Sequence, residues 1–194
     1  ELQIKQQSIK LDNNLFSEQG QFLKTQGETN LFLPEVNKQA EEEYINRFIN
    51  VFPNRPLTGL NIGIYQHSGV ARDHLVSIVS SLGANVNALN RSEIFIPVDT
   101  EAVREEDIQL AKKWINDYHF DAILTTDGDG DRPLISDEKG NWLRGDIIGI
   151  LCAQFLGIKH IVTPVSSNTA VEKSGLFESV SRTQIGSPYV IAGM

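Results

Sequence analysis

The chain contains the apolar stretch Ala122-Ile123-Leu124-Thr125-Thr126, followed at once by Asp127-Gly128-Asp129-Gly130-Asp131-Arg132. The first stretch is short and apolar, which predicts a buried strand. In the second, three carboxylates alternate with glycines, whose backbone freedom lets the loop curl. A curled loop directs the three carboxylates at one point, which suits a divalent cation such as Mg²⁺. The guanidinium that follows at Arg132 is well shaped to hold a phosphate, so the stretch predicts a metal ion beside a phosphate-binding cation.

Strands and helices are expected to alternate before this loop. Apolar runs at 60–65, 86–89 and 122–126 predict three strands, and apolar positions at helical spacing lie between them, near 75–82 and 108–118. Three strands and two helices in alternation are typical of a parallel, doubly wound sheet. Ligands bind such sheets at the carboxyl ends of the strands, and the acidic loop leaves the third strand at that end. Its position therefore supports a functional site independently of its composition.

Further elements are expected on both sides. Apolar residues at helical spacing predict a packing helix from about Pro34 to Phe52. Beyond the acidic loop, residues 133–143 predict a hairpin. Helix and strand patterns then alternate again, with a helix from Asp146 to Phe155 and strands at 161–165 and 180–184.

These patterns predict an α/β protein of more than one unit. Residues 35–143 are expected to form a three-layer domain with a mixed, mostly parallel sheet, and residues 144–194 the start of a second, similar α/β domain. Residues 1–34 are unplaced, although apolar positions between Leu2 and Leu11 suggest short strands. The chain lacks an initiating Met, which suggests a piece of a longer protein or a processed natural chain.

Several individual residues have expected structural roles. The residues expected to cap helices are Ser68, Asp99 or Thr100, Asp146 and the turn 166–168. His67 follows the first strand and is expected to face the cleft at its carboxyl end. Arg104 is expected on a solvated helix face, and Cys152 in the core. An ion pair is expected between Arg144 and Asp146.

Composition excludes some classes of partner. The 194 residues are 40% hydrophobic and carry a net charge of −8, which argues against binding to nucleic acid or to an anionic membrane. No apolar stretch approaches the roughly 20 residues that span a bilayer. With a single cysteine the chain has no disulfide framework, which favours a reducing compartment such as the cytoplasm.

The acidic loop is open to other interpretations. It could be an Asp-rich turn without a ligand, although three carboxylates so close repel one another unless a cation offsets their charge. It partly fits a calcium loop, with Asp127, Asp129 and Asp131 at the first three ligand positions and Glu138 at the last. However, Arg132 replaces the glycine of that pattern, and a strand precedes the loop. An aspartyl-phosphate phosphatase would use Asp127 as nucleophile and Asp129 as acid and base.

The loop 127–132 resembles the metal-binding loop of the α-D-phosphohexomutases, the phosphomannomutase/phosphoglucomutase family. Other stretches are also similar to that family, so that the resemblance covers about residues 35–194. They are residues 62–70, 95–102, 143–146 and 182–186.

The resemblance implies a fold and an activity. Family members have four domains around one cleft, so 35–143 would be domain 2, 144–194 part of domain 3, and 1–34 the end of domain 1. They move a phosphoryl group between the 1 and 6 positions of a hexose phosphate, through a phosphoserine and a hexose bisphosphate. By resemblance, Asp127, Asp129 and Asp131 would hold Mg²⁺, and Arg132 would contact the transferred phosphoryl group.

Part of the family's pattern does not occur in these 194 residues. The Ser-His-Asn-Pro motif that carries the phosphoserine is missing, and so is the sugar-selecting loop of the third domain. We therefore expect these residues alone to be inactive, and they do not indicate which hexose is preferred. A non-enzymatic metal-binding module that docks a partner is the alternative from another class.

Overall fold

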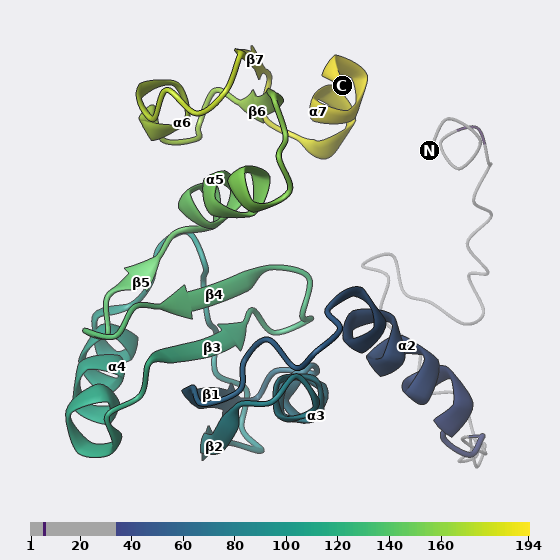
Figure 1. Ribbon diagram of the computed structural model, residues 1–194, viewed down its shortest axis with the longest axis vertical. Helices are drawn as coiled ribbons and strands as arrows, with labels where there is room; N and C mark the ends of the chain where they lie inside the picture. The colour runs from purple at the N-terminus through teal and green to yellow at the C-terminus, as the bar shows by residue number, and fades with distance from the viewer. Residues whose placement is uncertain (1–5, 7–33) are drawn as a thin grey trace, which may run out of the picture. The chain divides into compact units, whose positions relative to one another are not determined.

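The computed structural model describes residue 6 and residues 34–194 (Figure 1). The chain divides into two units, Glu1–Asn37 and Lys38–Met194, of which only the second is described at length. The strands expected between Leu2 and Leu11 lie outside the described residues.

The central element of the second unit is a five-stranded sheet, in the order β2-β1-β3-β4-β5. Its strands are β1 (Asn61–His67), β2 (Asn85–Arg91), β3 (Ala122–Thr126), β4 (Pro133–Ser136) and β5 (Trp142–Leu143). β1 pairs in parallel with both β2 and β3. β4 and β5 add the antiparallel edge expected of a hairpin. The predicted mixed, mostly parallel α/β sheet is confirmed.

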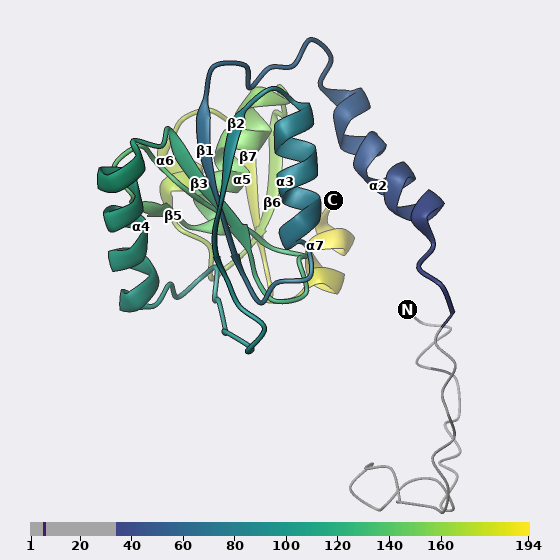
Figure 2. The same ribbon diagram turned by 90° about the horizontal axis from the view of Figure 1, so that it is seen from below.

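Two helices cover opposite faces of this sheet, α3 (Arg72–Ser81) and α4 (Glu105–Tyr118), as Figure 2 shows. Neighbouring residues of β1 point to opposite faces, as strand geometry requires. Ile64 packs with Val79 of α3, whereas Tyr65 packs with Trp114 of α4 and Ile123 of β3. Each face thus has its own hydrophobic core, which accounts for the three layers.

α2 (Lys38–Val51) precedes the sheet and contacts α3. The predicted helix is confirmed, but it buries none of its residues. Its Tyr44 stacks edge-on against His74 of α3 with ring centroids 5.9 Å apart, yet stays 46% exposed. The apolar face expected to pack is therefore covered only in part within the described residues.

The chain continues into a second group of elements. These are α5 (Gly145–Phe155), β6 (His160–Pro164), α6 (Ala170–Lys173), β7 (Ser179–Thr183) and α7 (Ser187–Gly193). β6 and β7 pair in parallel, which agrees with the alternation in the sequence. The domain boundary at residue 143 stays a prediction.

Cys152 lies in α5 and is exposed, so its expected place in the core was wrong. The helix is apolar on nearly all sides, and this pattern cannot show which side is buried. The buried residues of α5 are Ile148, Ile150 and Ala153. None of the helices in residues 34–194 is long and apolar enough to cross a membrane.

The expected cap of α3 was wrong. The residue before this helix is Ala71, and no side chain caps it. Ser68 instead bonds to a distant segment, since its Oγ accepts the backbone N–H of Ile96 at 2.8 Å. The hydroxyl therefore joins the end of β1 to the loop before α4.

The expected caps of α4 and α5 were also wrong. The residues before these helices are Arg104 and Arg144, and neither helix has a side-chain cap. Asp99 Oδ1 accepts two backbone N–H groups of its own turn, at 2.8 and 3.1 Å, and Thr100 is buried. Asp146 Oδ2 accepts a backbone N–H from the turn after β6, at 2.8 Å.

A buried carboxylate, Asp107, ties α4 to the sheet. Arg104 Nε donates to its Oδ2 at 2.8 Å, and Tyr65 Oη donates to its Oδ1 at 3.1 Å. Burial and the nearby Asp107 raise the pKa of Tyr65 to about 12. Trp142 of β5 also donates to the Asp107 carbonyl oxygen, at 3.0 Å. Arg104, expected on a solvated helix face, is 36% exposed and is also the partner of a buried charge.

We expect Ile123→Ala to lower the free energy of unfolding by about 2–5 kcal/mol, because it removes a large side chain from the core and leaves a cavity. Ile123 is 0% exposed, whereas Ile94 is 80% exposed. The matched control, Ile94→Ala, should change stability by less than about 0.5 kcal/mol. Urea unfolding followed by circular dichroism measures both. Equal effects of the two substitutions would contradict this description of the core.

Candidate metal centre

The acidic loop leaves the carboxyl end of β3, beside the carboxyl end of β1. Parallel pairing of β1 with β3 brings these two ends to the same edge of the sheet. Asp127 is buried, and Asp129 and Asp131 are exposed. Each of the three offers a carboxylate oxygen, and these oxygens all lie within 4.8 Å of one another. The structure therefore brings together the three residues predicted as metal ligands.

Contacts with the turn after β1 fix the path of the loop. Val70 N donates to Gly128 O at 3.0 Å. Gly130 has a φ of +81°, and a Cβ there would lie 3.1 Å from the Cβ of Ala71. Both the backbone conformation and the close approach favour glycine at this position. Gly130 thus lets the loop curl against the turn after β1.

Arg132 folds back onto Asp127. Its Nε donates to Asp127 Oδ2 at 2.7 Å, and its backbone N donates to Asp127 Oδ1 at 3.1 Å. Burial raises the pKa of Asp127, but the hydrogen bonds and the charge of Arg132 outweigh it, so this pKa lies below its ordinary value. The Arg132 side chain is still 53% exposed. A guanidinium has five N–H donors. Nη1 lies 4.0 Å from Glu101 Oε1, which is beyond hydrogen-bond distance, so the donors of the two terminal nitrogens can still bind an anion.

Asp129 and Asp131 repel each other. The charge of Asp129 is the main cause that raises the pKa of Asp131 above its ordinary value, and the neighbouring Asp127 adds to it. A cation between the carboxylates would remove this repulsion.

The donor set also fits a hard divalent cation. All three side chains offer oxygen, the element that Mg²⁺ prefers. With Mg–O distances of about 2.1 Å, oxygens on one ion lie within about 4.2 Å of each other. The observed limit of 4.8 Å therefore requires only small side-chain movements.

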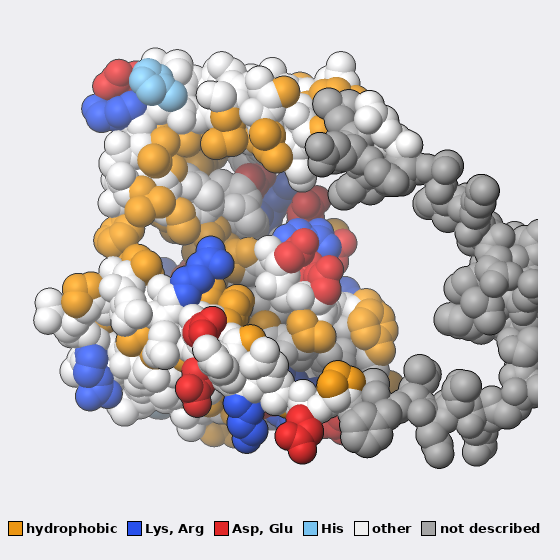
Figure 3. Space-filling model, turned by 90° about the vertical axis from the view of Figure 1, so that its right-hand side faces the viewer, with side chains coloured by type: hydrophobic (Ala, Val, Ile, Leu, Met, Phe, Trp, Pro, Cys, Tyr) orange, Lys and Arg blue, Asp and Glu red, His pale blue; other side chains and the backbone are white. Residues whose placement is uncertain are grey.

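A hollow of about 430 Å³ lies beside Arg132. Figure 3 shows acidic and basic side chains gathered around a hollowed part of the surface. The wall of the hollow includes Arg132, Arg144, Asp146, Ser166 and Ser167. Arg144 Nη2 lies 3.4 Å from Asp146 Oδ2, so the expected ion pair is present.

Two wall residues were missed as site candidates in the sequence. Ser166 and Ser167 were interpreted as a turn and cap, but they line the hollow. They follow β6 at its carboxyl end, which is the position that also pointed to the acidic loop. The rule that ligands bind at the carboxyl ends of parallel strands could therefore have identified Ser166 and Ser167.

His67 does not face the hollow. Its side chain is 1% exposed, and its Nε2 lies 2.9 Å from Thr126 O. The prediction that it faces a cleft was wrong, because the turn after β1 folds over the ring. A Cβ on Gly69 would lie only 2.9 Å from the ring atom Cε1.

Comparison with known proteins identifies the family. Residues 42–140 match the family described as phosphoglucomutase/phosphomannomutase, alpha/beta/alpha domain II. The chain belongs to this family. Over 157 residues it is 50% identical to a phosphomannomutase of Salmonella muenchen. The aligned stretch covers 81% of this chain and 33% of that protein. It is 48% identical to a phosphomannomutase of Sinorhizobium fredii, again over 81% of this chain and 33% of that protein.

A solved structure shares the fold. A phosphoglucomutase/phosphomannomutase family protein of Burkholderia thailandensis superposes with a TM-score of 0.67 over 79% of this chain and 35% of that one, at 18% identity. The chain thus spans about a third of the length of the phosphomannomutases it matches.

We expect Asp129→Asn to lower the pKa of Asp131 in metal-free solution, because it removes the main repelling charge. The pKa of the Asp131 carboxyl group can be followed by carbon-detected NMR in the presence of a chelator. Asp117→Asn, which makes the same change beside Lys113 in α4, should leave that pKa unchanged. An unchanged Asp131 pKa in Asp129→Asn would show that the two carboxylates do not interact.

Proposed function

We propose that the chain is the metal-binding part of a phosphohexomutase that interconverts hexose 1-phosphate and hexose 6-phosphate. The observation that carries this proposal is sequence identity of 50% and 48% to two phosphomannomutases, over a stretch that includes the acidic loop. The hexose is mannose or glucose, and the reaction passes through a phosphoserine and a hexose bisphosphate. We place the reaction in the cytoplasm, without nucleic acid or membrane as a partner.

Asp127, Asp129 and Asp131 would hold Mg²⁺. When bound, the ion supplies positive charge that stabilises the transferred phosphoryl oxygens. Asp127 contributes a carboxylate that Arg132 keeps ionised and oriented. Asp129 and Asp131 contribute exposed carboxylates on the same loop as Arg132.

Arg132 would bind the phosphoryl group during transfer. Its Nε–H stays on Asp127, so the plane of the guanidinium is set before substrate arrives. The N–H groups on its terminal nitrogens are then available for phosphate oxygens. Phosphoryl transfer depends mainly on such positioning and on charge neutralisation, which this arrangement can provide.

The hollow beside Arg132 would receive the hexose phosphate. Its wall carries Arg144 and the hydroxyl groups of Ser166 and Ser167, which suit the phosphate and hydroxyl groups of a sugar phosphate. Hydrogen-bonding groups around a polar ligand of this kind are typical of small-molecule sites.

The geometry disfavours an aspartyl-phosphate phosphatase. Both oxygens of Asp127 accept hydrogen bonds from Arg132, and the residue is 3% exposed. A nucleophile must reach the phosphorus atom, and a buried carboxylate held in this way is poorly placed to do so. A metal-binding module without catalytic function would have no need of Arg132 beside the metal.

We expect Mg²⁺ and mannose 1-phosphate each to raise the unfolding temperature of the chain, as ligands of the folded state do. Asp129→Asn should lose the effect of Mg²⁺. Arg132→Ala should weaken mannose 1-phosphate binding about tenfold or more, because it removes charge-assisted hydrogen bonds. Differential scanning fluorimetry with Mg²⁺, Ca²⁺ and mannose 1-phosphate measures these effects.

Arg47→Ala is the matched control, since Arg47 lies on α2 and its guanidinium faces Phe48. It should change neither response. Stabilisation by Mg²⁺ without any binding of mannose 1-phosphate would favour the metal-binding module. No response to Mg²⁺ would contradict the proposed metal centre.

We expect these 194 residues alone to show no mutase turnover, because they contain no Ser-His-Asn-Pro motif to carry the phosphoryl group. The assay supplies mannose 1-phosphate, a hexose 1,6-bisphosphate and Mg²⁺, and follows formation of the 6-phosphate by phosphorus NMR. Isomerisation that increases with protein concentration would contradict this prediction.

A further inference from the structure

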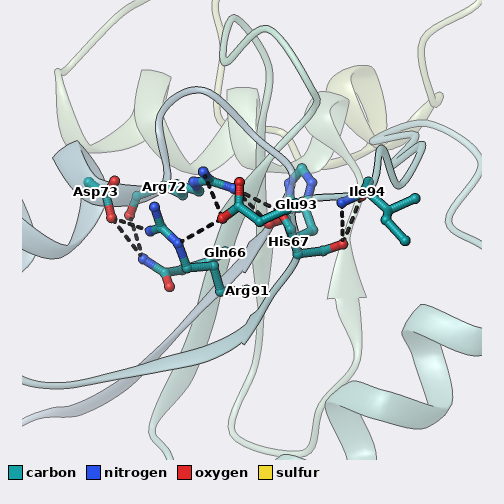
Figure 4. Close-up of polar contacts among 8 residues, drawn as sticks. Gln66, His67, Arg72, Asp73, Arg91, Glu93 and Ile94 are labelled. Carbon is teal, nitrogen blue, oxygen red and sulfur yellow. Dashed lines mark hydrogen bonds and ion pairs between the residues drawn. The ribbon is translucent and has the colours of Figure 1, made fainter.

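His67 joins the ends of three strands. Figure 4 shows it with Arg72, beside Arg91 and Glu93 at the end of β2. Its carbonyl oxygen accepts the backbone N–H of Ser92, which follows β2, at 2.9 Å. The same oxygen lies 3.5 Å from Arg72 Nη1, which also donates to Ser92 O at 2.8 Å. Its ring Nε2 lies 2.9 Å from the carbonyl oxygen of Thr126, the last residue of β3. The residue therefore touches all three parallel strands at the edge where the candidate metal centre lies.

The chemistry of the acceptor fixes the direction of the ring hydrogen bond. A carbonyl oxygen can only accept, so Nε2 must carry the proton and donate it to Thr126 O. The other ring nitrogen, Nδ1, is buried and has no hydrogen-bond partner among the described residues. A neutral ring protonated at Nε2 is therefore the form that this site accommodates.

The hydrogen bond from His67 acts next to the first metal ligand. Thr126 O belongs to the peptide group that joins Thr126 to Asp127, and Thr126 Oγ1 donates to Asp127 O at 2.8 Å. On the other side of Asp127, Gly128 O accepts from Val70 N at 3.0 Å. The turn that begins at His67 thus holds the backbone on both sides of Asp127.

The local backbone is shaped around the ring. His67 has a φ of +31°, a region that residues with a side chain seldom adopt. Gly69 leaves the space that the ring fills, since a Cβ there would lie 2.9 Å from Cε1. Such a conformation persists where surrounding contacts enforce it, and is often found beside functional sites.

We propose that His67 is a positioning residue of the metal centre. Its Nε2–H fixes the carbonyl group of Thr126, and this sets the direction in which Asp127 presents its carboxylate beside Asp129 and Asp131. Groups that orient metal ligands in this way contribute strongly to metal affinity. The inference rests on the proposed function, because it requires a metal bound by the three carboxylates.

The test measures Mn²⁺ affinity of the 194-residue chain, from the electron paramagnetic resonance signal of free Mn²⁺. His67→Leu removes the donor and keeps a side chain of moderate size, and should weaken binding by about 10- to 100-fold. His67→Gln offers an amide N–H in place of Nε2–H, so its Mn²⁺ affinity should stay within about threefold of the wild type. A larger loss is expected only where the hydrogen bond itself is removed.

Two controls complete the series. His74→Leu replaces a histidine of α3 whose ring Nε2 lies 3.3 Å from Glu41 of α2, and should leave Mn²⁺ affinity unchanged. Asp129→Asn should abolish tight binding. All variants are measured below the temperature at which the least stable one begins to unfold.

The outcomes separate this inference from the proposed function. Tight binding by the wild type and equally tight binding by His67→Leu would overturn the role of His67 and leave the metal centre intact. Equal losses in His67→Gln and His67→Leu would overturn it too, because the donor would then not be what matters. A wild type that does not bind Mn²⁺, or an Asp129→Asn variant that binds equally well, would overturn the metal centre itself.

A spectroscopic measurement on the wild type needs no folded variant. Long-range ¹H–¹⁵N NMR spectra distinguish the two neutral forms of a histidine ring. We expect His67 to be protonated at Nε2. A ring protonated at Nδ1 would overturn the inference, because Nε2 could not then donate to Thr126 O. This test remains valid even if His67→Leu does not fold.

Discussion

The mutual repulsion of three carboxylates is the constraint on which this edge of the molecule depends. Asp127, Asp129 and Asp131 place their oxygens within 4.8 Å of one another, and like charges at such distances destabilise the loop unless something offsets them. Arg132 offsets the charge of Asp127. The charges of Asp129 and Asp131 are not offset to the same degree, and the raised pKa of Asp131 is the result. The fold thus holds a charge arrangement that a cation would stabilise.

The sheet supplies the rigidity that this arrangement needs. β3 lies inside the sheet with β1 on one side and β4 on the other, and Ile123 is fully buried in one of the two cores. The loop that follows β3 therefore starts from a fixed point. The turn after β1 then supports it through the contact of Val70 N with Gly128 O. Parallel pairing of β1 and β3 is what brings this turn to the loop.

Much of the fold could be predicted because its patterns are local. β3 is an apolar run of five residues that ends at an acidic, glycine-rich loop, and both its ends were predicted correctly. The proximity of the three carboxylates also follows from short sequence spacing. The caps could not be predicted, because the partners of Ser68 and Asp146 come from distant backbone segments. The position of His67 depends on tertiary packing in the same way. Arg104 contacts Asp107 three residues further on, but the burial of Asp107 depends on packing against Tyr65.

Asp127 connects the two halves of the candidate site. Each oxygen of a carboxylate has two lone pairs, so Asp127 can accept from Arg132 on both oxygens and still offer a lone pair to a metal ion. The distance between the metal and the guanidinium would then be set by one buried side chain. In the proposed site, a phosphoryl group bound between them would meet two positive charges whose spacing does not depend on a flexible linker. Lysine could supply the charge, but it lacks the planar fork that lets Arg132 hold Asp127 and still present other donors. The proposed role would account for an arginine after the three carboxylates, and for its shortest contact being with the buried one.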